Sequence, residues 1–307
     1  MTTPNLETTM GRITMVNPVM VASGTFGYGP EYADYMDLDS LGAMVVKGVS
    51  VEPWEGNRTP RLVEVAGGLV NAIGLQNPGF DGFVSTYMPF LRKLHTPVIV
   101  NIWGRTLEEY EAIAAKFETV EGVAGLELNV SCPNIKEGGI AFGTDLAMLA
   151  KVVGAVRRRT TRTLIVKLSP NVTRIADFAK TAEEHGADAL SLMNTYPAMV
   201  IDIETRRPVL ANVTGGLSGP AIHPIAVKLV YEAAKAVKIP VVGMGGIREA
   251  AEAIEFLIAG ARAVAVGTAN FTDPGTVPRV VAGIRDYLVR HRLGSVSDLV
   301  GTVKVGS

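Results

Sequence analysis

The sequence has few residues that bind metals or form disulfides. Cysteine occurs once, at Cys132, in a chain of 307 residues. One cysteine excludes an internal disulfide, and it excludes a thiolate-ligated zinc or iron–sulfur site built from this chain alone. The histidines lack the spacing of metal ligands, so no metal site is predicted; they are His95, His185, His223 and His291.

Excess charge and long apolar runs are also missing. Lysine and arginine total 29 against 30 acidic residues, which gives a net charge of −1. Such a balance provides no field to hold nucleic acid or an anionic membrane. No apolar run reaches the roughly 18 residues of a membrane-spanning helix, and the start, MTTPNLETTMGRITM, lacks a signal pattern. We therefore expect a cytoplasmic protein without nucleic-acid or membrane partners.

Short apolar runs alternate with amphipathic helical patterns along the chain. Their length and their valine and isoleucine content favour strands, and near-continuous apolar strands indicate a parallel sheet. Eight strand–helix pairs predict an α/β fold, a (β/α)8 TIM barrel, with an open doubly wound sheet as the alternative. The expected strands are 18–23, 43–48, 97–104, 125–131, 163–170, 189–195, 240–246 and 263–268. The clearest helices are 106–120, 144–159 and 174–186.

Several segments lie outside this repeat. Residues 6–16 predict an N-terminal hairpin that plugs the bottom of the barrel, and residues 60–75 predict a second hairpin, inserted after strand two. Further insertions follow strand four and strand six, the latter a long polar segment over 196–220. Because no linker-like or low-complexity segment interrupts the chain, we expect a single domain, 1–307.

The ends of the predicted strands carry polar residues. In this fold the active site lies at the carboxyl ends of the strands. One polar residue at a strand end usually just meets water, but six in series followed by glycines predict a polar, positively biased site. These residues are Ser23, Lys47, Asn101, Asn129, Lys167 and Asn194, then Gly245 with Gly246, and Gly267 with Thr268.

The glycine-rich loops after strands seven and eight occupy the usual phosphate position of this fold. Glycines let a phosphate approach backbone N–H groups, the following helix N-terminus adds a favourable dipole, and Gly219 adds a further donor. The run GMGGIR is not a dinucleotide fingerprint, because Arg248 stands where the third glycine belongs. A mononucleotide that carries a phosphate fits better.

The lysines and asparagines indicate what else binds. Lys47 and Lys167 end apolar runs with no acid among the strand-end residues, so we expect their anionic partners to come from ligands. Lys167 would face a cofactor that gains negative charge, and Lys47 a substrate carboxylate or the cofactor. The asparagines suit imide edges, and the NAIGLQN segment offers backbone N–H groups near Gly74 and Leu75 for a carboxylate.

Taken in order, these motifs resemble a known family. The stretches VASGTFGYG, VVKGVS, NAIGLQNPG, VNIWG, ELNVSCPN, VKLSPN, MNT, GGLSGP, GMGGI and AVAVGT are similar to those of class 1 dihydroorotate dehydrogenase catalytic chains, over nearly the whole length. The resemblance implies an FMN-binding barrel that oxidises dihydroorotate to orotate in pyrimidine biosynthesis. It also implies that Cys132 is the catalytic base, on a loop that covers the substrate.

The resemblance assigns two further sets of residues. Those expected to bind FMN are Ser23, Lys47, Gly48, Asn101, Asn129, Lys167, the Met193 backbone, Gly219, Gly245, Gly246, Gly267 and Thr268. Those expected to bind the substrate are Lys47, Asn71, Ala72, Ile73, Gly74, Leu75, Asn129, Asn194 and Thr195.

Within class 1, NAIGLQN resembles the NAD-linked subclass (class 1B), since the fumarate-linked subclass more often has proline at the place of Gln76. That subclass implies a partner subunit with FAD and a [2Fe–2S] cluster, around a homodimer core in a heterotetramer. The single cysteine agrees, because this chain cannot ligate such a cluster alone.

Other functions remain open from the residues. The nearest are a fumarate-linked class 1A dihydroorotate dehydrogenase and another FMN barrel reductase that acts on pyrimidines. A barrel lyase or isomerase with a phosphorylated substrate would leave the asparagines unexplained. A flavoprotein subunit that only transfers electrons would hold FMN but would not be reduced by dihydroorotate.

Overall fold

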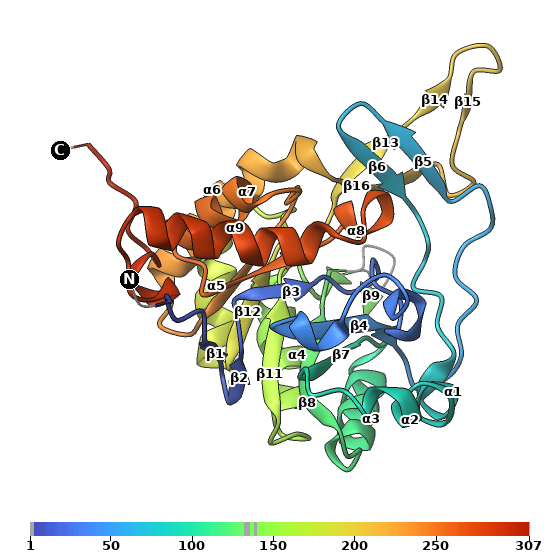
Figure 1. Ribbon diagram of the computed structural model, residues 1–307. Helices are drawn as coiled ribbons and strands as arrows, with labels where there is room; N and C mark the ends of the chain where they lie inside the picture. The colour runs from blue at the N-terminus through green and yellow to red at the C-terminus, as the bar shows by residue number, and fades with distance from the viewer. Residues whose placement is uncertain (1–2, 132–135, 138–139, 307) are drawn as a thin grey trace.

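Eight parallel strands close into a barrel (Figure 1) in the computed structural model, which describes residues 3–131, 136–137 and 140–306. Every expected strand is present, so the barrel is confirmed and the open sheet is excluded. The barrel strands are β3 (Val19–Val21), β4 (Ala43–Val49), β7 (Val98–Ile102), β8 (Val123–Asn129), β11 (Thr163–Lys167), β12 (Ala189–Leu192), β17 (Val241–Met244) and β18 (Ala263–Val266).

The barrel strands are buried on both faces. Side chains alternate along a strand, so Leu126 and Leu128 of β8 pack in the large cluster beneath the helices. Ile99 of β7 and Ile165 of β11 belong to a separate cluster in the barrel interior. This double burial explains why the strands read as continuous apolar runs in the sequence.

Helices surround the barrel, and in the described part of the chain none is long and apolar enough to cross a membrane. Thr106 and Asp145 cap two of them, since their side chains accept from the backbone N–H groups of Glu109 and Met148. The helices are α1 (Gly79–Thr86), α2 (Met88–Leu91), α3 (Leu107–Glu118), α4 (Leu146–Arg157), α5 (Ile175–Glu184), α6 (His223–Ala236), α7 (Ala250–Ala259), α8 (Ala269–Thr272) and α9 (Thr276–Arg290).

The first strand departs from the expected repeat. Between β3 and β4 the chain forms only two 3₁₀ turns, η1 (Pro30–Tyr32) and η2 (Leu38–Ser40), so the expectation of a helix after every strand is wrong here. Gly24, Gly27 and Gly29 have φ values of 83°, 56° and 109°, in the left-handed region that an α-helix does not use.

The N-terminal hairpin closes the bottom of the barrel, as predicted. Strands β1 (Thr8–Met10) and β2 (Ile13–Met15) pair antiparallel, and Met10, Ile13 and Met15 are buried in the interior cluster. The backbone N–H of Arg12 donates to Oγ1 of Thr163, the first residue of β11. The amino ends of the strands are therefore filled, and only the carboxyl ends are left for a site.

The insertions after strands two and six form one sheet. Strands β5 (Leu62–Val65) and β6 (Gly68–Asn71) make the expected hairpin. The segment 196–220 supplies β13 (Tyr196–Met199) and β16 (Thr214–Ser218), which give the antiparallel order β13-β16-β6-β5. Its polarity had not indicated strands.

Two short hairpins complete the insertions. Strands β14 (Ile201–Asp202) and β15 (Arg207–Pro208) project from the four-stranded sheet, as Figure 1 shows at the upper right. After strand four, β9 (Lys136–Glu137) pairs with β10 (Ile140–Ala141). The predicted insertions after strands two, four and six are thus all present.

Candidate active site

A buried polar cluster lies near the carboxyl ends of the barrel strands. Glu127 is 1% exposed, and its Oε1 accepts from Asn101 Nδ2 at 2.7 Å and from Ser23 Oγ at 3.1 Å. Its Oε2 accepts from Ser191 Oγ at 2.8 Å. Lys167 Nζ donates to Ser23 Oγ at 3.2 Å and lies 3.9 Å from Glu127 Oε1. Three predicted site residues therefore meet around an acid that had not been predicted.

Glu127 corrects one expectation. The absence of an acid among the strand-end residues had suggested that ligands alone would balance both lysines, but Lys167 has this carboxylate beside it. Only the last residue or two of each strand had been considered. Glu127 lies two positions before Asn129, and alternation points both side chains into the barrel. The signal was present in the sequence as a lone charge inside the apolar run GLELNVS.

The amide of Asn101 has a fixed orientation. Its Nδ2 is committed to Glu127, and its Oδ1 lies toward Gly48, where an added Cβ would be only 2.8 Å from that oxygen. Gly48 therefore leaves room for the amide, and Asn101 turns its acceptor toward the end of β4. An oxygen in this position is suited to an imide N–H.

Lys47 is half-buried and lies near a second cation. Burial lowers the pKa of Lys47, and the neighbouring Arg61 lowers it further, while Glu31 partly opposes the shift. Arg61 was not predicted as a site residue, because it lies in the β5–β6 insertion and not at a strand end. It donates through Nη2 to Gln76 Oε1 at 2.5 Å, so the residue that suggested the NAD-linked subclass takes part in this cluster.

The glycine-rich loops meet at one place on the rim. A Cβ on Gly246 would lie 2.9 Å from the carbonyl oxygen of Gly219, and Thr268 Oγ1 donates to Ser218 Oγ at 2.8 Å. The backbone N–H groups of Gly219, Gly246 and Thr268 have no acceptor within the described residues. The geometry therefore gathers donors from three separate loops. Gly245, with φ 138°, and Gly267 lie in the same loops.

The N-terminus of α7 contributes less than expected. Glu249 and Glu252 form a capping box there, and Glu252 Oε2 accepts from the backbone N–H groups of Arg248 and Glu249. A helix end that its own carboxylates occupy offers little to a phosphate. The expected dipole contribution is not supported at α7, and the donors on the rim are those of the glycine loops.

The predicted substrate residues come together across the inserted sheet. Asn71 Nδ2 donates to the Gly216 carbonyl at 3.3 Å, and a Cβ on Gly216 would collide with Thr195 Oγ1. Asn194 Oδ1 accepts from the backbone N–H of Thr195 at 2.8 Å. The β6 and β16 strands thus place Asn71 beside the end of β12.

The NAIGLQN segment is held by Asn57. The backbone N–H of Asn57 donates to the Ile73 carbonyl at 3.0 Å, and its Nδ2 donates to the Ala72 carbonyl at 2.9 Å. Gly74 and Leu75 adopt φ values of 76° and 63°. Their backbone N–H groups have no acceptor in the described part of the chain, which leaves two donors for an anion.

The end of β8 anchors the remaining predicted residues. Asn129 is buried and its Oδ1 accepts from the backbone N–H of Ser131, whose hydroxyl donates to the Lys167 carbonyl at 3.1 Å. Cys132, the predicted base, follows directly in the chain but lies outside the described residues. Met193 is buried, and its backbone N–H already donates to the Met244 carbonyl.

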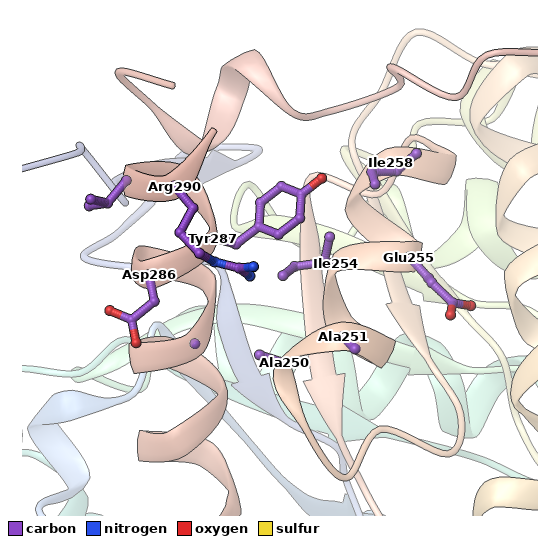
Figure 2. A pocket seen from close by; sticks show the side chains of 10 residues that line it. Ala250, Ala251, Ile254, Glu255, Ile258, Asp286, Tyr287 and Arg290 are labelled. Atoms are coloured by element: carbon purple, nitrogen blue, oxygen red, sulfur yellow. The ribbon is translucent and has the colours of Figure 1, made fainter. Parts of the chain in front are cut away.

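A pocket lies away from this cluster, between α7 and α9 (Figure 2). Ile254 and Ile258 of α7 line it together with Tyr287 of α9, while Glu255, Asp286 and Arg290 carry its charged groups. It belongs to the outer helical layer and includes none of the strand-end residues, so it is not the candidate active site.

Comparisons with known proteins identify the family. A family model described as dihydroorotate dehydrogenase matches residues 5–288. The chain belongs to the dihydroorotate dehydrogenase family. The resemblance seen in the motifs is thereby confirmed, and family membership makes the chain a flavin-dependent oxidoreductase.

Several relatives carry the same description, "dihydroorotate dehydrogenase B (NAD(+)), catalytic subunit". The protein of Citrifermentans bemidjiense is 55% identical over 98% of this chain and 99% of its own length. That of Geotalea daltonii is 53% identical over 99% of this chain and 100% of its own. The Geobacter sulfurreducens protein is 53% identical over 98% of this chain and 99% of its own length. The predicted likeness to NAD-linked dihydroorotate dehydrogenases is confirmed, and the words "catalytic subunit" imply that these relatives work with a separate subunit.

Proposed function

We propose that this chain is a single-domain catalytic subunit that binds FMN and oxidises dihydroorotate to orotate in pyrimidine biosynthesis. The observation that carries the proposal is the convergence of Lys167, Asn101 and Asn129 at one end of a barrel of this family. The other end is closed by the N-terminal hairpin.

The residues at the rim fit FMN. The phosphate would be held by backbone donors of the loops at Gly219, Gly245, Gly246, Gly267 and Thr268. The N–H groups of Gly219, Gly246 and Thr268 have no acceptor among the residues that the structure describes. Asn101 presents an acceptor for an imide N–H, and Lys167 presents a buried cation. When bound, FMN supplies the acceptor for the hydride that leaves C6 of dihydroorotate.

The flavin site would be completed by four further groups. Lys47 would add a second cation, and Gly48 leaves room for the Asn101 amide. Ser23 would hold the ammonium of Lys167 in place through its hydroxyl. The Met193 backbone would contribute through its carbonyl, because its N–H is already engaged.

The substrate would lie between the flavin and the inserted sheet. Dihydroorotate carries a carboxylate, and the N–H groups at Gly74 and Leu75 together with Lys47 would bind it. The amides of Asn71, Asn129 and Asn194, with Thr195, would hold the pyrimidine ring by its imide edges. Ala72 and Ile73, fixed by Asn57, would keep this segment in place.

Cys132 would be the general base that removes the proton from C5. It is bonded to Ser131, which is tied to the end of β11 through the Lys167 carbonyl. The base must act on the face of the substrate opposite the flavin, which suits a residue beyond a strand end better than one on the barrel floor. Its thiolate is the active form.

Electrons would leave through a partner subunit with FAD and a [2Fe–2S] cluster, on the way to NAD. One cysteine cannot ligate such a cluster, and the relatives are described as NAD-linked catalytic subunits. We further propose a homodimer core within a heterotetramer, in the cytoplasm.

The activity is tested by turnover. The FMN content of the purified chain is measured after the flavin is released. The chain should convert dihydroorotate to orotate when a redox dye accepts the electrons. A Lys167→Met variant should lose most of this activity, because it removes the buried cation that stabilises negative charge on the flavin. A yellow protein that forms no orotate with any acceptor would contradict the proposal.

A further inference from the structure

Glu127 is a charged side chain that neither the proposed flavin contacts nor the proposed substrate contacts use. It is 1% exposed on the inner face of β8, directly paired in register with Asn101 of β7. A buried carboxylate is destabilising by several kcal/mol unless donors and a cation compensate it. The fold provides both, which indicates a specific role.

The contacts of Glu127 fit an ionised carboxylate. Asn101 Nδ2, Ser23 Oγ and Ser191 Oγ all lie within hydrogen-bond distance of its oxygens, at 2.7, 3.1 and 2.8 Å. An ionised carboxylate only accepts, so each of these groups has to donate. The hydroxyl of Ser23 can then accept from Lys167 Nζ, as its 3.2 Å distance allows.

We propose that Glu127 is a positioning residue, the resident counter-ion of Lys167 that also sets the orientation of Asn101. This inference rests on the proposed function, because it assigns what Lys167 and Asn101 present to the flavin. The carboxylate holds Nζ of Lys167 at 3.9 Å through Ser23 and forces Oδ1 of Asn101 toward Gly48.

The pair would also set the charge that the site presents to a bound flavin. With Glu127 ionised, Lys167 and its counter-ion are together neutral, so the lysine stabilises a reduced, anionic flavin less than an isolated ammonium would. Removal of the negative charge leaves one uncompensated positive charge in a buried site, where Coulomb interactions are strong. Compared with the unmodified protein, the site would then bind reduced flavin more tightly relative to oxidised flavin.

The flavin potential tests this role. Glu127→Gln keeps the shape and removes the charge, so we expect reduced FMN to gain at least tenfold in binding relative to oxidised FMN. That gain corresponds to a rise of about 30 mV in the two-electron midpoint potential. Glu127→Asp disturbs the packing more but keeps the charge. Its ratio of reduced-FMN to oxidised-FMN affinity should stay within threefold of that of the unmodified protein. The exposed Glu121→Gln is the matched control and should change nothing.

Two results for the flavin potential would overturn the proposal. If Glu127→Asp shifts the potential as much as Glu127→Gln, packing and not charge is responsible, and the role is structural. An unshifted potential in Glu127→Gln likewise excludes the counter-ion.

A second measurement needs no flavin and separates this inference from the proposed function. In the full chain without flavin, Glu127→Gln should lower the midpoint of urea unfolding. The decrease should be larger in the otherwise unmodified protein than in Lys167→Met, because the Lys167→Met protein has no buried cation left without a counter-ion. Equal lowering in both backgrounds would refute the pairing, even if FMN and dihydroorotate prove to be the ligands. If Glu127→Gln fails to fold, the double variant should restore a folded protein, and its failure to do so would also refute the pairing.

Discussion

At the scale of single residues, burial and a cationic neighbour act together on Lys47 at the rim. Its pKa is lowered by burial and by Arg61. A lysine binds a carboxylate while protonated, so orotate affinity should be complete below the lowered pKa and should fall as the pH rises through it.

Arg61→Gln should therefore move this loss of affinity to higher pH, because removal of a positive neighbour raises the pKa of Lys47 toward its usual value. The orotate dissociation constant at neutral pH should increase by about fivefold or less, as expected for a half-exposed charge. Titration of the flavin spectrum with orotate over a pH series measures both effects. Arg58→Gln, on the exposed loop before the hairpin, is the control; a fall at the same pH in both variants would contradict the assigned neighbour.

Cys132 is predicted to act as a base through its thiolate. An ordinary thiol has a pKa of about 8.5, so the rate of flavin reduction by dihydroorotate should rise about tenfold per pH unit below that value and then level off. Cys132→Ser should lower the neutral-pH rate by roughly 10²-fold or more. Stopped-flow absorbance of the flavin measures it, and an unchanged rate would remove Cys132 from this role.

At the scale of single residues, the sequence indicated the site residues that end strands. It did not lead to the residues that hold those site residues in position. Asn101, Asn129 and Lys167 could be found because each ends an apolar run. Glu127 was missed although it is a lone charge inside an apolar run, because only the last residue or two of each strand had been considered. Arg61 could not be found, since it approaches the site only through the folding of an insertion. The roles assigned to the site residues stay predictions.

Among the elements, the inserted sheet is predicted to position the substrate-binding residues. Gly216 in β16 has no space for a side chain, because a Cβ would lie 2.6 Å from the Cβ of Thr195. Gly216→Ala should therefore displace Thr195 and Asn71 and raise the KM for dihydroorotate by about tenfold or more, equivalent to 1.4 kcal/mol, while the FMN content stays the same.

The control for this variant is Gly154→Ala in α4, where the nearest atom to an added Cβ is the flexible end of Arg158 at 3.8 Å. Alanine in a helix is more favourable than glycine, so this variant should keep its KM and gain slightly in stability. Equal KM values in both variants would show that β16 does not position the substrate residues.

The N-terminal hairpin acts as a structural plug. Met10 is fully buried in the barrel interior, so Met10→Ala should lower the free energy of unfolding by about 2–5 kcal/mol. Met199→Ala, at 47% exposure on β13, should stay within about 0.5 kcal/mol. Urea unfolding followed by circular dichroism compares them, and equal midpoints would contradict a packed hairpin.

Elements whose burial creates a repeating pattern were predictable. The barrel strands and the N-terminal hairpin follow from apolar runs and their lengths. Strands β13 and β16 were not recognised, because neither contains a buried residue. Alternate residues of β13 are exposed and it contains Pro197, while β16 contains Gly215 and Gly216. The missing helix after β3 reflects glycines whose left-handed conformation is set by the tertiary fold.

For the whole molecule, the barrel topology follows from counting strand–helix units, and one end of the barrel is closed by the hairpin. The described chain therefore has one polar rim for a cofactor and a substrate. No group of three His, Cys, Asp or Glu side chains capable of holding a metal occurs among the described residues.

The central claim is tested most directly by anaerobic reduction of the isolated chain. Dihydroorotate should bleach the yellow flavin absorbance stoichiometrically with orotate formation, whereas NADH at the same concentration should leave it oxidised, because the proposed route to NAD runs through a partner subunit. A flavin that dihydroorotate fails to bleach, or that NADH bleaches equally fast in the isolated chain, would contradict this account.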